Sequence, residues 1–149
     1  MKILDVNVLI YAFRPEPPQH APVRAWLERL VQSNRPFGVP DIVLAGFVRT
    51  ITRKPFDPPS TPQEAWGFVD VLASMPQCTI FYGSPEHFAA FRAICKDADV
   101  RGNLLTDAYI AAHAIMSDGE IVSCDDDFSK FPGLTWRNPI DDQPRTNPR

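Results

Sequence analysis

Several features are scarce in this 149-residue chain, and each shortage excludes a class of protein. Only 7 residues are glycine, so the chain is not a glycine-rich fibrous or disordered protein, although its 16 prolines are about twice the usual share. The 3 cysteines include no C-x-x-C pair, which argues against a disulfide framework and predicts reduced thiols. No apolar run approaches the roughly 18 residues of a membrane span, and the N-terminus lacks a signal-peptide pattern. We therefore expect a cytoplasmic chain with no membrane partner.

An excess of basic residues is also missing. The formal net charge is −3, so the chain lacks the positive field of a protein that binds nucleic acid through charge alone. A polyanionic partner would need a local basic patch or a metal ion. What the chain does contain is 44% hydrophobic and 22% charged residues, which is close to ordinary globular composition. At this length we expect one domain over residues 1–140, followed by a polar, frayed tail over residues 141–149.

The prolines divide the chain into windows in which helices can form, because a proline inside a helix costs about 3 kcal/mol. Apolar residues at helical spacing predict helices over residues 23–32, 41–52, 61–74, 84–96 and 103–116. Short apolar strands are predicted at residues 1–4, 37–39, 78–81, 120–123 and 135–137. This alternation predicts an α/β layered fold with a mainly parallel central sheet and helices on both faces.

Acidic residues stand where the predicted strands end. Asp5 follows the first strand, and Asp125 and Asp127 follow the strand at residues 120–123. Asp107 lies early in the helix that precedes that strand. Taken singly, each acid has a simpler interpretation as a helix cap, a first-turn residue or part of a solvated turn. Ligands of parallel α/β sheets, however, collect beyond the carboxyl ends of the strands.

If these carboxylates converge, they need a counter-ion. Two carboxylates about 4 Å apart repel by roughly 4 kcal/mol at an effective dielectric constant near 20. A set of ligands made only of oxygen atoms favours Mg²⁺ or Mn²⁺, held by a few carboxylates and several waters. The acids together therefore predict a divalent metal site.

Three stretches of the chain carry a resemblance to a known family. They are I-L-D-V-N-V-L-I-Y-A at the N-terminus, T-D-A-Y-I-A-A-H-A, and S-C-D-D-D-F-S-K-F-P-G-L. In this order and spacing, from residue 1 to about residue 140, they resemble the PIN domain. More closely, they resemble the VapC-type ribonuclease toxins of bacterial toxin–antitoxin pairs. The resemblance implies a metal-dependent endoribonuclease that hydrolyses RNA phosphodiesters with the help of Mg²⁺, with Mn²⁺ as the other possible ion.

The resemblance also implies roles for individual residues. The implied metal ligands are Asp5, Asp107 and Asp125. The implied catalytic acids are these three together with Asp127. Supporting hydrogen bonds around the acids are implied for Asn7 and Ser123. An acidic site that receives RNA also needs cations to offset its field, and the candidates for binding RNA are Arg14, Arg49 and Arg53.

One position departs from the family pattern. The family usually carries a glutamate on the helix after the second strand, in a pattern like E-F-x-R, whereas this chain reads A-G-F-V-R. Gly46 therefore stands at the glutamate position, while Arg49 is retained. Glycine inside a helix costs up to about 1 kcal/mol relative to alanine, which makes it an unusual choice for packing alone.

The glycine leaves two hypotheses open. In the first, the chain is an active ribonuclease whose metal shell is completed by water or by another acid. In the second, it is a degenerate PIN-like module that binds RNA or protein without cleavage. A third candidate, a phosphatase of the haloacid dehalogenase type, requires D-x-D after the first strand, and the chain has Asp5-Val6-Asn7 there.

The resemblance implies partners as well as chemistry. It implies a small antitoxin protein whose C-terminal segment covers the acids, and a homodimer with two active sites along a shared groove. We further expect the proline-rich segments at residues 15–22 and 55–62 to flank the groove that takes the RNA. The three histidines are expected to have packing or surface roles, and the RNA that is cut is not identified by the sequence.

Overall fold

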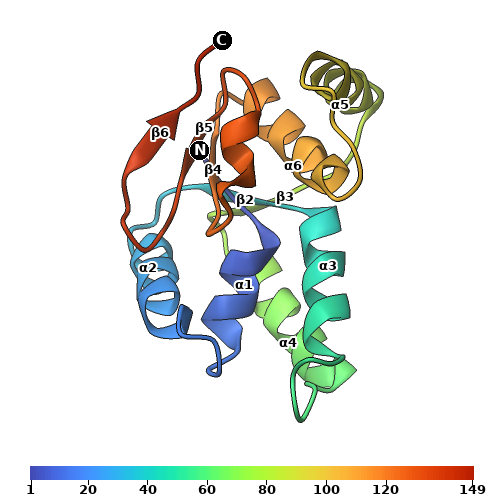
Figure 1. Ribbon diagram of the computed structural model, residues 1–149. Coiled ribbons are helices and arrows are strands. Elements are labelled where there is room, and N and C mark those ends of the chain that lie inside the picture. The colour runs from blue at the N-terminus through green and yellow to red at the C-terminus, as the bar shows by residue number, and fades with distance from the viewer.

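The computed structural model describes residues 1–149 and contains one six-stranded sheet with the strand order β3–β2–β1–β4–β5–β6 (Figure 1). The strands are β1 (Lys2–Leu4), β2 (Phe37–Pro40), β3 (Cys78–Phe81), β4 (Glu120–Val122), β5 (Thr135–Arg137) and β6 (Pro144–Thr146). The first five are parallel, and β6 pairs with β5 in the antiparallel direction. The predicted α/β fold with a mainly parallel sheet is confirmed.

Six α-helices connect the strands. They are α1 (Val6–Phe13), α2 (His20–Gln32), α3 (Asp41–Ile51), α4 (Pro62–Ala73), α5 (Pro85–Asp97) and α6 (Leu104–Met116), and a short 3₁₀ helix, η1 (Asp126–Lys130), follows β4. None of them is long and apolar enough to cross a bilayer.

Local sequence signals explain where α2 and α4 begin. The amide of Glu64 donates to Thr61 Oγ1 over 3.2 Å, while the Glu64 carboxylate accepts from the Thr61 amide over 2.7 Å. This capping box places Pro62 at the first helical position, where the missing N–H costs nothing. Helix α2 begins three residues earlier than predicted, since Pro22 falls in its first turn and needs no helical partner there.

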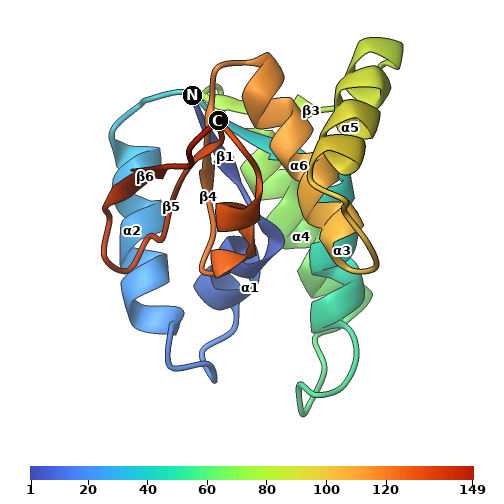
Figure 2. The ribbon, with the colours of Figure 1, turned by 45° about the horizontal axis from the view of Figure 1, so that its top comes forward.

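The handedness of the connections places helices on both faces of the sheet. From β1 to β2 to β3 the chain moves in one direction across the sheet, and from β3 to β4 it moves back past β1. Because such crossovers are right-handed, α1 to α4 must cover one face and α5 and α6 the other. Figures 1 and 2 show this division, with α5 and α6 set apart beside β3. The direction of travel reverses between β1 and β4.

The core is formed where both layers meet the central strands. Ile3 and Leu4 of β1 and Ile121 of β4 are fully buried. Helix α6 approaches the sheet closely because its inward face is made of small side chains. These are Ala108, Ala111, Ala112 and Ala114, all without solvent exposure. The packing of α6 fixes the depth at which its first turn, with Asp107, stands relative to the strand ends.

The C-terminal residues differ from the predicted frayed tail. Residues 144–146 form β6, with Thr135 opposite Thr146 and Trp136 opposite Arg145. Arg145 also stacks over the Trp136 ring, 4.7 Å from its centroid. The polar composition of this segment suits an edge strand with one face in solvent, which a search for apolar strands does not detect.

The proline-rich segments are also placed differently from the prediction. They lie at the far ends of α1 and α3, at the bottom of Figure 1, rather than beside the strand ends. Helices of 8 and 11 residues separate them from the sheet, or about 12 and 16 Å at 1.5 Å per residue. The expectation that both loops flank a groove at the acids is therefore wrong.

Candidate active site

The acidic residues lie at the ends of β1 and β4, between which the order of strand addition changes direction. β1 and β4 are adjacent and parallel, with Leu4 opposite Val122, so both strands end at the same edge. Asp5 follows β1 and Ser123 follows β4, and the Asp5 amide continues the ladder by donating to Val122 O over 3.0 Å. The crevice beyond two such strands is the usual ligand site of an open α/β sheet.

Asp5 is the most buried acid of the chain, with 3% of its surface exposed. Its Oδ1 accepts from the Val6 amide over 2.6 Å, which caps α1. Its Oδ2 accepts from Asn7 Nδ2 and from Ser123 Oγ, each over 2.7 Å. The cost of burial exceeds these hydrogen bonds and raises the pKa of Asp5 to about 6, with the charge of Asp125 adding to the shift.

Asn7 and Ser123 tie the two strand ends together. Asn7 Nδ2 also donates to Ser123 Oγ over 2.9 Å, and Asn7 Oδ1 accepts from the Cys124 amide over 3.0 Å. Ser123 Oγ in turn accepts from the Asp125 amide over 2.9 Å. These bonds hold Asp5 and the turn that bears Asp125 in one rigid unit.

The turn after β4 presents two further acids. Asp125 caps η1 by accepting from the Asp127 amide over 2.9 Å. Asp127 Oδ1 accepts from Lys130 Nζ over 2.5 Å, one helical turn farther on. The hydrogen bonds of Asp125 and Asp127 therefore stabilise the turn between β4 and η1 and the first turn of η1.

Asp107 reaches the same place from α6. Burial raises its pKa to about 7, and the charges of Asp5, Asp125 and Asp127 add to the shift, while Lys130 opposes it. Burial is the larger cause, and the additional effect of the three charges places Asp107 within their electrostatic reach. The four predicted acids therefore lie around the same edge of the sheet and influence one another's charge.

The chemistry of this cluster fits a hard divalent cation. Its side-chain donors toward the crevice are carboxylate oxygens, and two of the carboxyl groups have raised pKa values that a cation would lower. No group of three or more Asp, Glu, His or Cys side chains is close enough to enclose an ion by itself. A cation held by one or two carboxylates together with waters, as Mg²⁺ usually is, matches this spacing.

Comparison with known proteins identifies the family. A sequence model of the PIN domain matches residues 2–134. The chain belongs to the PIN domain family. Ribonuclease VapC43 of Mycobacterium tuberculosis is 42% identical over 144 residues, which cover 96% of this chain and 98% of that protein. Ribonuclease VapC31 of the same species is 38% identical over 140 residues, 93% of this chain and 99% of that protein.

The fold is also found in a toxin–antitoxin complex. The crystal structure of VapBC2 from Rickettsia felis, bound to a DNA fragment from its promoter, superposes with a TM-score of 0.69. The alignment covers 92% of this chain and 97% of that one, at 21% sequence identity. This likeness shows that the PIN fold is shared.

The glutamate position of this PIN domain borders a pocket. Gly46 lies on α3, and the pocket beside it has a volume of about 310 Å³. Its walls are Val6, Ile42, Val43, Ala45, Gly46, Arg49, Thr50, Thr106 and Ile110. Val6 and Thr106 are the chain neighbours of Asp5 and Asp107, so the backbone that forms the pocket wall leads directly to both acids. Asp41 is not part of the acid cluster, since its charge acts on Tyr109 and His113 instead.

The three arginines predicted to bind RNA have different surroundings. Arg14 is buried, and its guanidinium donates to Ser60 Oγ over 2.7 Å and to Pro58 O over 3.0 Å, and pairs with Glu16. The prediction for Arg14 is wrong, because four hydrogen bonds hold its buried guanidinium between the two proline-rich loops, at the far ends of α1 and α3 from the acids. Arg49 lines the pocket beside Gly46. Arg53 is exposed beyond the end of α3, about one turn farther from the sheet.

Two residues near the acids were not predicted from the sequence. Lys130 carries the positive charge that lowers the pKa of Asp107, and it is about half exposed. Burial raises the pKa of the Tyr11 hydroxyl, and Cys124, Asp125 and Asp5 add to the shift, which places that hydroxyl beside the acids. Spacing could have indicated both, since Tyr11 lies one turn after Asn7 on α1 and Lys130 one turn after Asp127 on η1.

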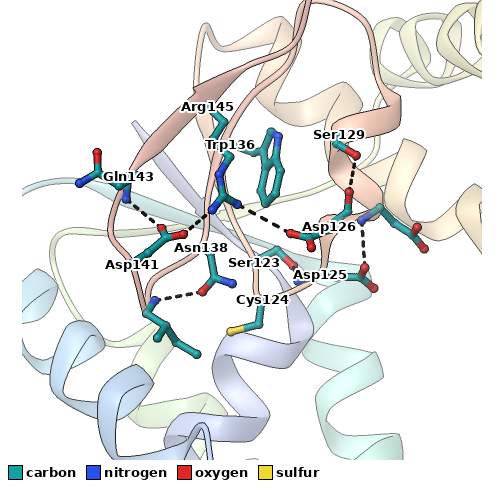
Figure 3. A network of polar contacts seen from close by, with 12 residues as sticks. Ser123, Cys124, Asp125, Asp126, Ser129, Trp136, Asn138, Asp141, Gln143 and Arg145 are labelled. Carbon is teal, nitrogen blue, oxygen red and sulfur yellow. Dashed lines mark hydrogen bonds and ion pairs between the residues drawn. The ribbon is translucent and has the colours of Figure 1, made fainter.

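The C-terminal strand holds the turn that carries Asp125 and Asp127. Asn147 Nδ2 donates to Phe128 O over 2.8 Å and to Phe131 O over 2.7 Å. Arg145 lies 3.7 Å from Asp126 and also pairs with Asp141 (Figure 3). Asp126 is exposed and faces this arginine. These contacts come from residues beyond the part matched by the PIN model.

Proposed function

We propose that this PIN domain is a divalent-metal-dependent endoribonuclease and acts as the toxin of a toxin–antitoxin pair. The observation that carries the proposal is the convergence of four carboxylates at the point where the sheet reverses. Its support from relatives is the ribonuclease activity named for VapC43 and VapC31, which align with nearly the whole chain.

We propose Asp5, Asp107 and Asp125 as the metal ligands, one or two of them binding the ion directly and the rest through water, with Asp127 as a further catalytic acid. Asn7 and Ser123 orient Asp5 through their hydrogen bonds, so that its carboxylate keeps a fixed direction. When bound, Mg²⁺, or Mn²⁺ in its place, would neutralise charge on the scissile phosphate and lower the pKa of a water molecule. Lys130 and Arg49 supply positive charge at the rim, which reduces the repulsion between the acids and the RNA backbone.

A partner protein is part of the proposal. One solved structure with this fold is a toxin–antitoxin complex from Klebsiella pneumoniae, which superposes with a TM-score of 0.62. We propose that a small cognate antitoxin covers the acids of this chain, and that the toxin is a homodimer in the cytoplasm, where cellular RNA lies. Size-exclusion chromatography with light scattering tests the dimer, and affinity purification of the tagged chain from its own cells, followed by mass spectrometry of small co-purifying proteins, tests the antitoxin.

The enzymatic proposal is tested by RNA cleavage with purified protein. The chain should cut RNA in Mg²⁺ or Mn²⁺ and stop when EDTA is added. Asp107→Asn should lower the rate by about two orders of magnitude or more, because it removes charge from the place where the phosphate is stabilised. Asp70→Asn, which changes an exposed acid on α4, is the matched control and should keep the wild-type rate. Equal cleavage by wild type and Asp107→Asn would exclude the proposal.

The degenerate module stays as the alternative because of Gly46. Calorimetric titration with Mn²⁺ separates the two hypotheses. Binding that Asp107→Asn abolishes favours the enzyme. A chain that binds RNA tightly, but neither binds Mn²⁺ nor cuts RNA, would be the degenerate module.

A further inference from the structure

Neither the backbone nor the packing of α3 requires glycine at position 46. The residue lies in the middle of the helix, and its φ is outside the left-handed region that favours glycine. A Cβ atom at this position would meet only Val6 Cγ2, at an ordinary contact distance of 3.4 Å. Any residue other than proline would also increase helix propensity. The glycine therefore has a use other than the stability of α3.

The absence of a side chain at Gly46 keeps a neighbouring pocket open. Gly46 forms part of the wall of the 310 Å³ pocket between α1, α3 and α6, and a side chain there would project into it. Five of the nine lining residues are hydrophobic. The volume lies at the lower end of the range of about 300–1,000 Å³ that is typical of small-molecule sites.

The polar groups of this pocket suit an anionic chain that carries a flat ring. Arg49 forms no ion pair within the protein, and no carboxylate lines the pocket. Thr50 and Thr106 bring hydroxyl groups that can donate to or accept from a base edge. Unstacked RNA bases are bound in this way, with apolar contact on the ring and hydrogen bonds at its edge, while an arginine fork suits the phosphate.

We propose that this pocket receives one unstacked base of the RNA, next to the phosphodiester at the acids, and that Gly46 determines which positions are cut. The inference rests on the proposed ribonuclease function and adds a base-binding site to it. Its position follows from the chain itself, since Val6 and Thr106 join the pocket directly to Asp5 and Asp107. A base in this pocket would hold its neighbouring phosphate beside the acid cluster.

Filling the pocket tests the proposal. Gly46→Ala adds one methyl group and Gly46→Leu fills the space, and Gly67→Ala and Gly67→Leu are the matched controls. Gly67 is also inside a helix, but it is exposed and an added Cβ would have no neighbour within 4 Å. Each variant is incubated with an RNA pool randomised around a fixed single-stranded region, and the cut positions are mapped. We expect Gly46→Leu to lose the base preference at one position flanking the cut, while both Gly67 variants keep it.

A second measurement connects the pocket to that base. An RNA of the preferred sequence is made with an abasic ribose at the flanking position. For the wild type, loss of the base should raise KM about tenfold or more, since the contacts between the base and the pocket are lost. For Gly46→Leu the two RNAs should have the same KM. Thermal unfolding of all variants establishes that each is folded.

The outcomes separate this inference from the proposed function. If the wild type cuts RNA and Gly46→Leu keeps both the preference and the sensitivity to the abasic ribose, the base pocket is excluded and the ribonuclease stands. If Gly46→Leu alters only the binding of an antitoxin, the pocket takes a protein side chain and the proposal is overturned. If the wild type does not cut RNA under any metal condition, the ribonuclease function itself fails.

Discussion

The carboxyl group of Asp107 has properties that its position in the first turn of a helix would not produce alone. Its pKa is raised to about 7, first by burial and then by three neighbouring acids. The pKa of Asp107 is 3.8 in an unperturbed chain and about 7 in the folded protein. Between these two pH values the folded state binds more protons than the unfolded state. Stability contributed by the protonated form is therefore present at low pH and lost as the pH rises.

In metal-free protein, kept in EDTA, the stability of Asp107→Asn should depend on pH differently from that of the wild type. Asp107→Asn should have a higher free energy of unfolding than the wild type at pH 8 and a similar one at pH 4. The gain should be on the order of 1–2 kcal/mol, which allows for solvent screening at a half-buried site. Urea unfolding at both pH values measures it, with Asp70→Asn as the control. A difference that does not change with pH would show that the acids do not share one electrostatic field.

The buried histidine His113 has the opposite effect on stability. His87 and His113 stack with ring centroids 3.7 Å apart, and His87 Nδ1 and His113 Nε2 have no hydrogen-bond partner. Their burial confirms the packing role expected for them. Desolvation, with a contribution from His87, lowers the pKa of His113 to about 4 against an opposing effect of Asp41. The stability of the neutral form is therefore present above pH 6.5 and lost as the pH falls toward 4.

His113→Phe should remove this loss. The phenyl ring keeps the stack on His87 and Phe81 but cannot gain a proton. We expect the free energy of unfolding to fall less between pH 7 and pH 4 in this variant than in the wild type, by on the order of 1–2 kcal/mol. His20→Gln, at a partly exposed ring on α2, should follow the wild type. Parallel pH profiles of wild type and His113→Phe would contradict the assignment.

Among the secondary structure elements, β6 has the least expected role. It lies at the sheet edge, yet the residue after it reaches under η1 and donates to two main-chain carbonyls there. η1 carries Asp127 and begins just after Asp125. The turn that carries these acids is therefore held by Asn147, which follows β6 and lies outside residues 2–134, the part matched by the PIN model.

Asn147→Ala should weaken both the fold and the metal site. Two buried carbonyls lose their donor, so we expect a loss of about 1–3 kcal/mol in the free energy of unfolding. Because η1 is released, the affinity for Mn²⁺ should also fall by about tenfold. Gln143→Ala, an exposed change in the same segment, is the control. If Asn147→Ala lowers stability but leaves Mn²⁺ affinity unchanged, β6 stabilises the sheet without positioning the acids.

At the scale of the whole molecule, the acid cluster joins elements from both layers of the fold. Asp5 belongs to the layer of α1, whereas Asp107 belongs to α6 on the other face of the sheet. A cation bound between them would link the two layers and bind the folded state only. The bound cation would remove the repulsion between the carboxylates, and its binding would add to the free energy of unfolding.

Divalent metal should therefore raise the unfolding temperature of the wild type. At a Mn²⁺ concentration about 100 times the Kd, the gain is about 2.7 kcal/mol. Asp5→Asn should show little or none of this gain at the same Mn²⁺ concentration. Differential scanning fluorimetry at pH 7.5 with Mn²⁺, Mg²⁺ and EDTA measures the shift. A similar shift in Asp5→Asn would place the metal elsewhere on the protein.

The sequence by itself determined the features that depend on neighbouring residues. Proline-free windows, the Thr61 capping box and short apolar strands predict most helices, five strands and the α/β class. The boundaries of these elements differ by only a few residues from the structure, because caps and prolines act within one turn. The order of the acidic motifs was sufficient for the resemblance to the PIN domain.

Only the tertiary structure decided which side chains meet. Ser123 donates to Asp5 across 118 positions of sequence, and that contact exists because β1 and β4 are neighbours in the sheet. Arg14 and Arg49 look equivalent as charges, yet α1 carries Arg14 away from the acids to the proline-rich loops. Strand β6 forms because β5 offers an unpaired edge. Lys130 acts on Asp107 of α6, and α6 also supplies Thr106 and Ile110 to the pocket at Gly46. Such contacts join residues far apart in the chain, so no local pattern specifies them.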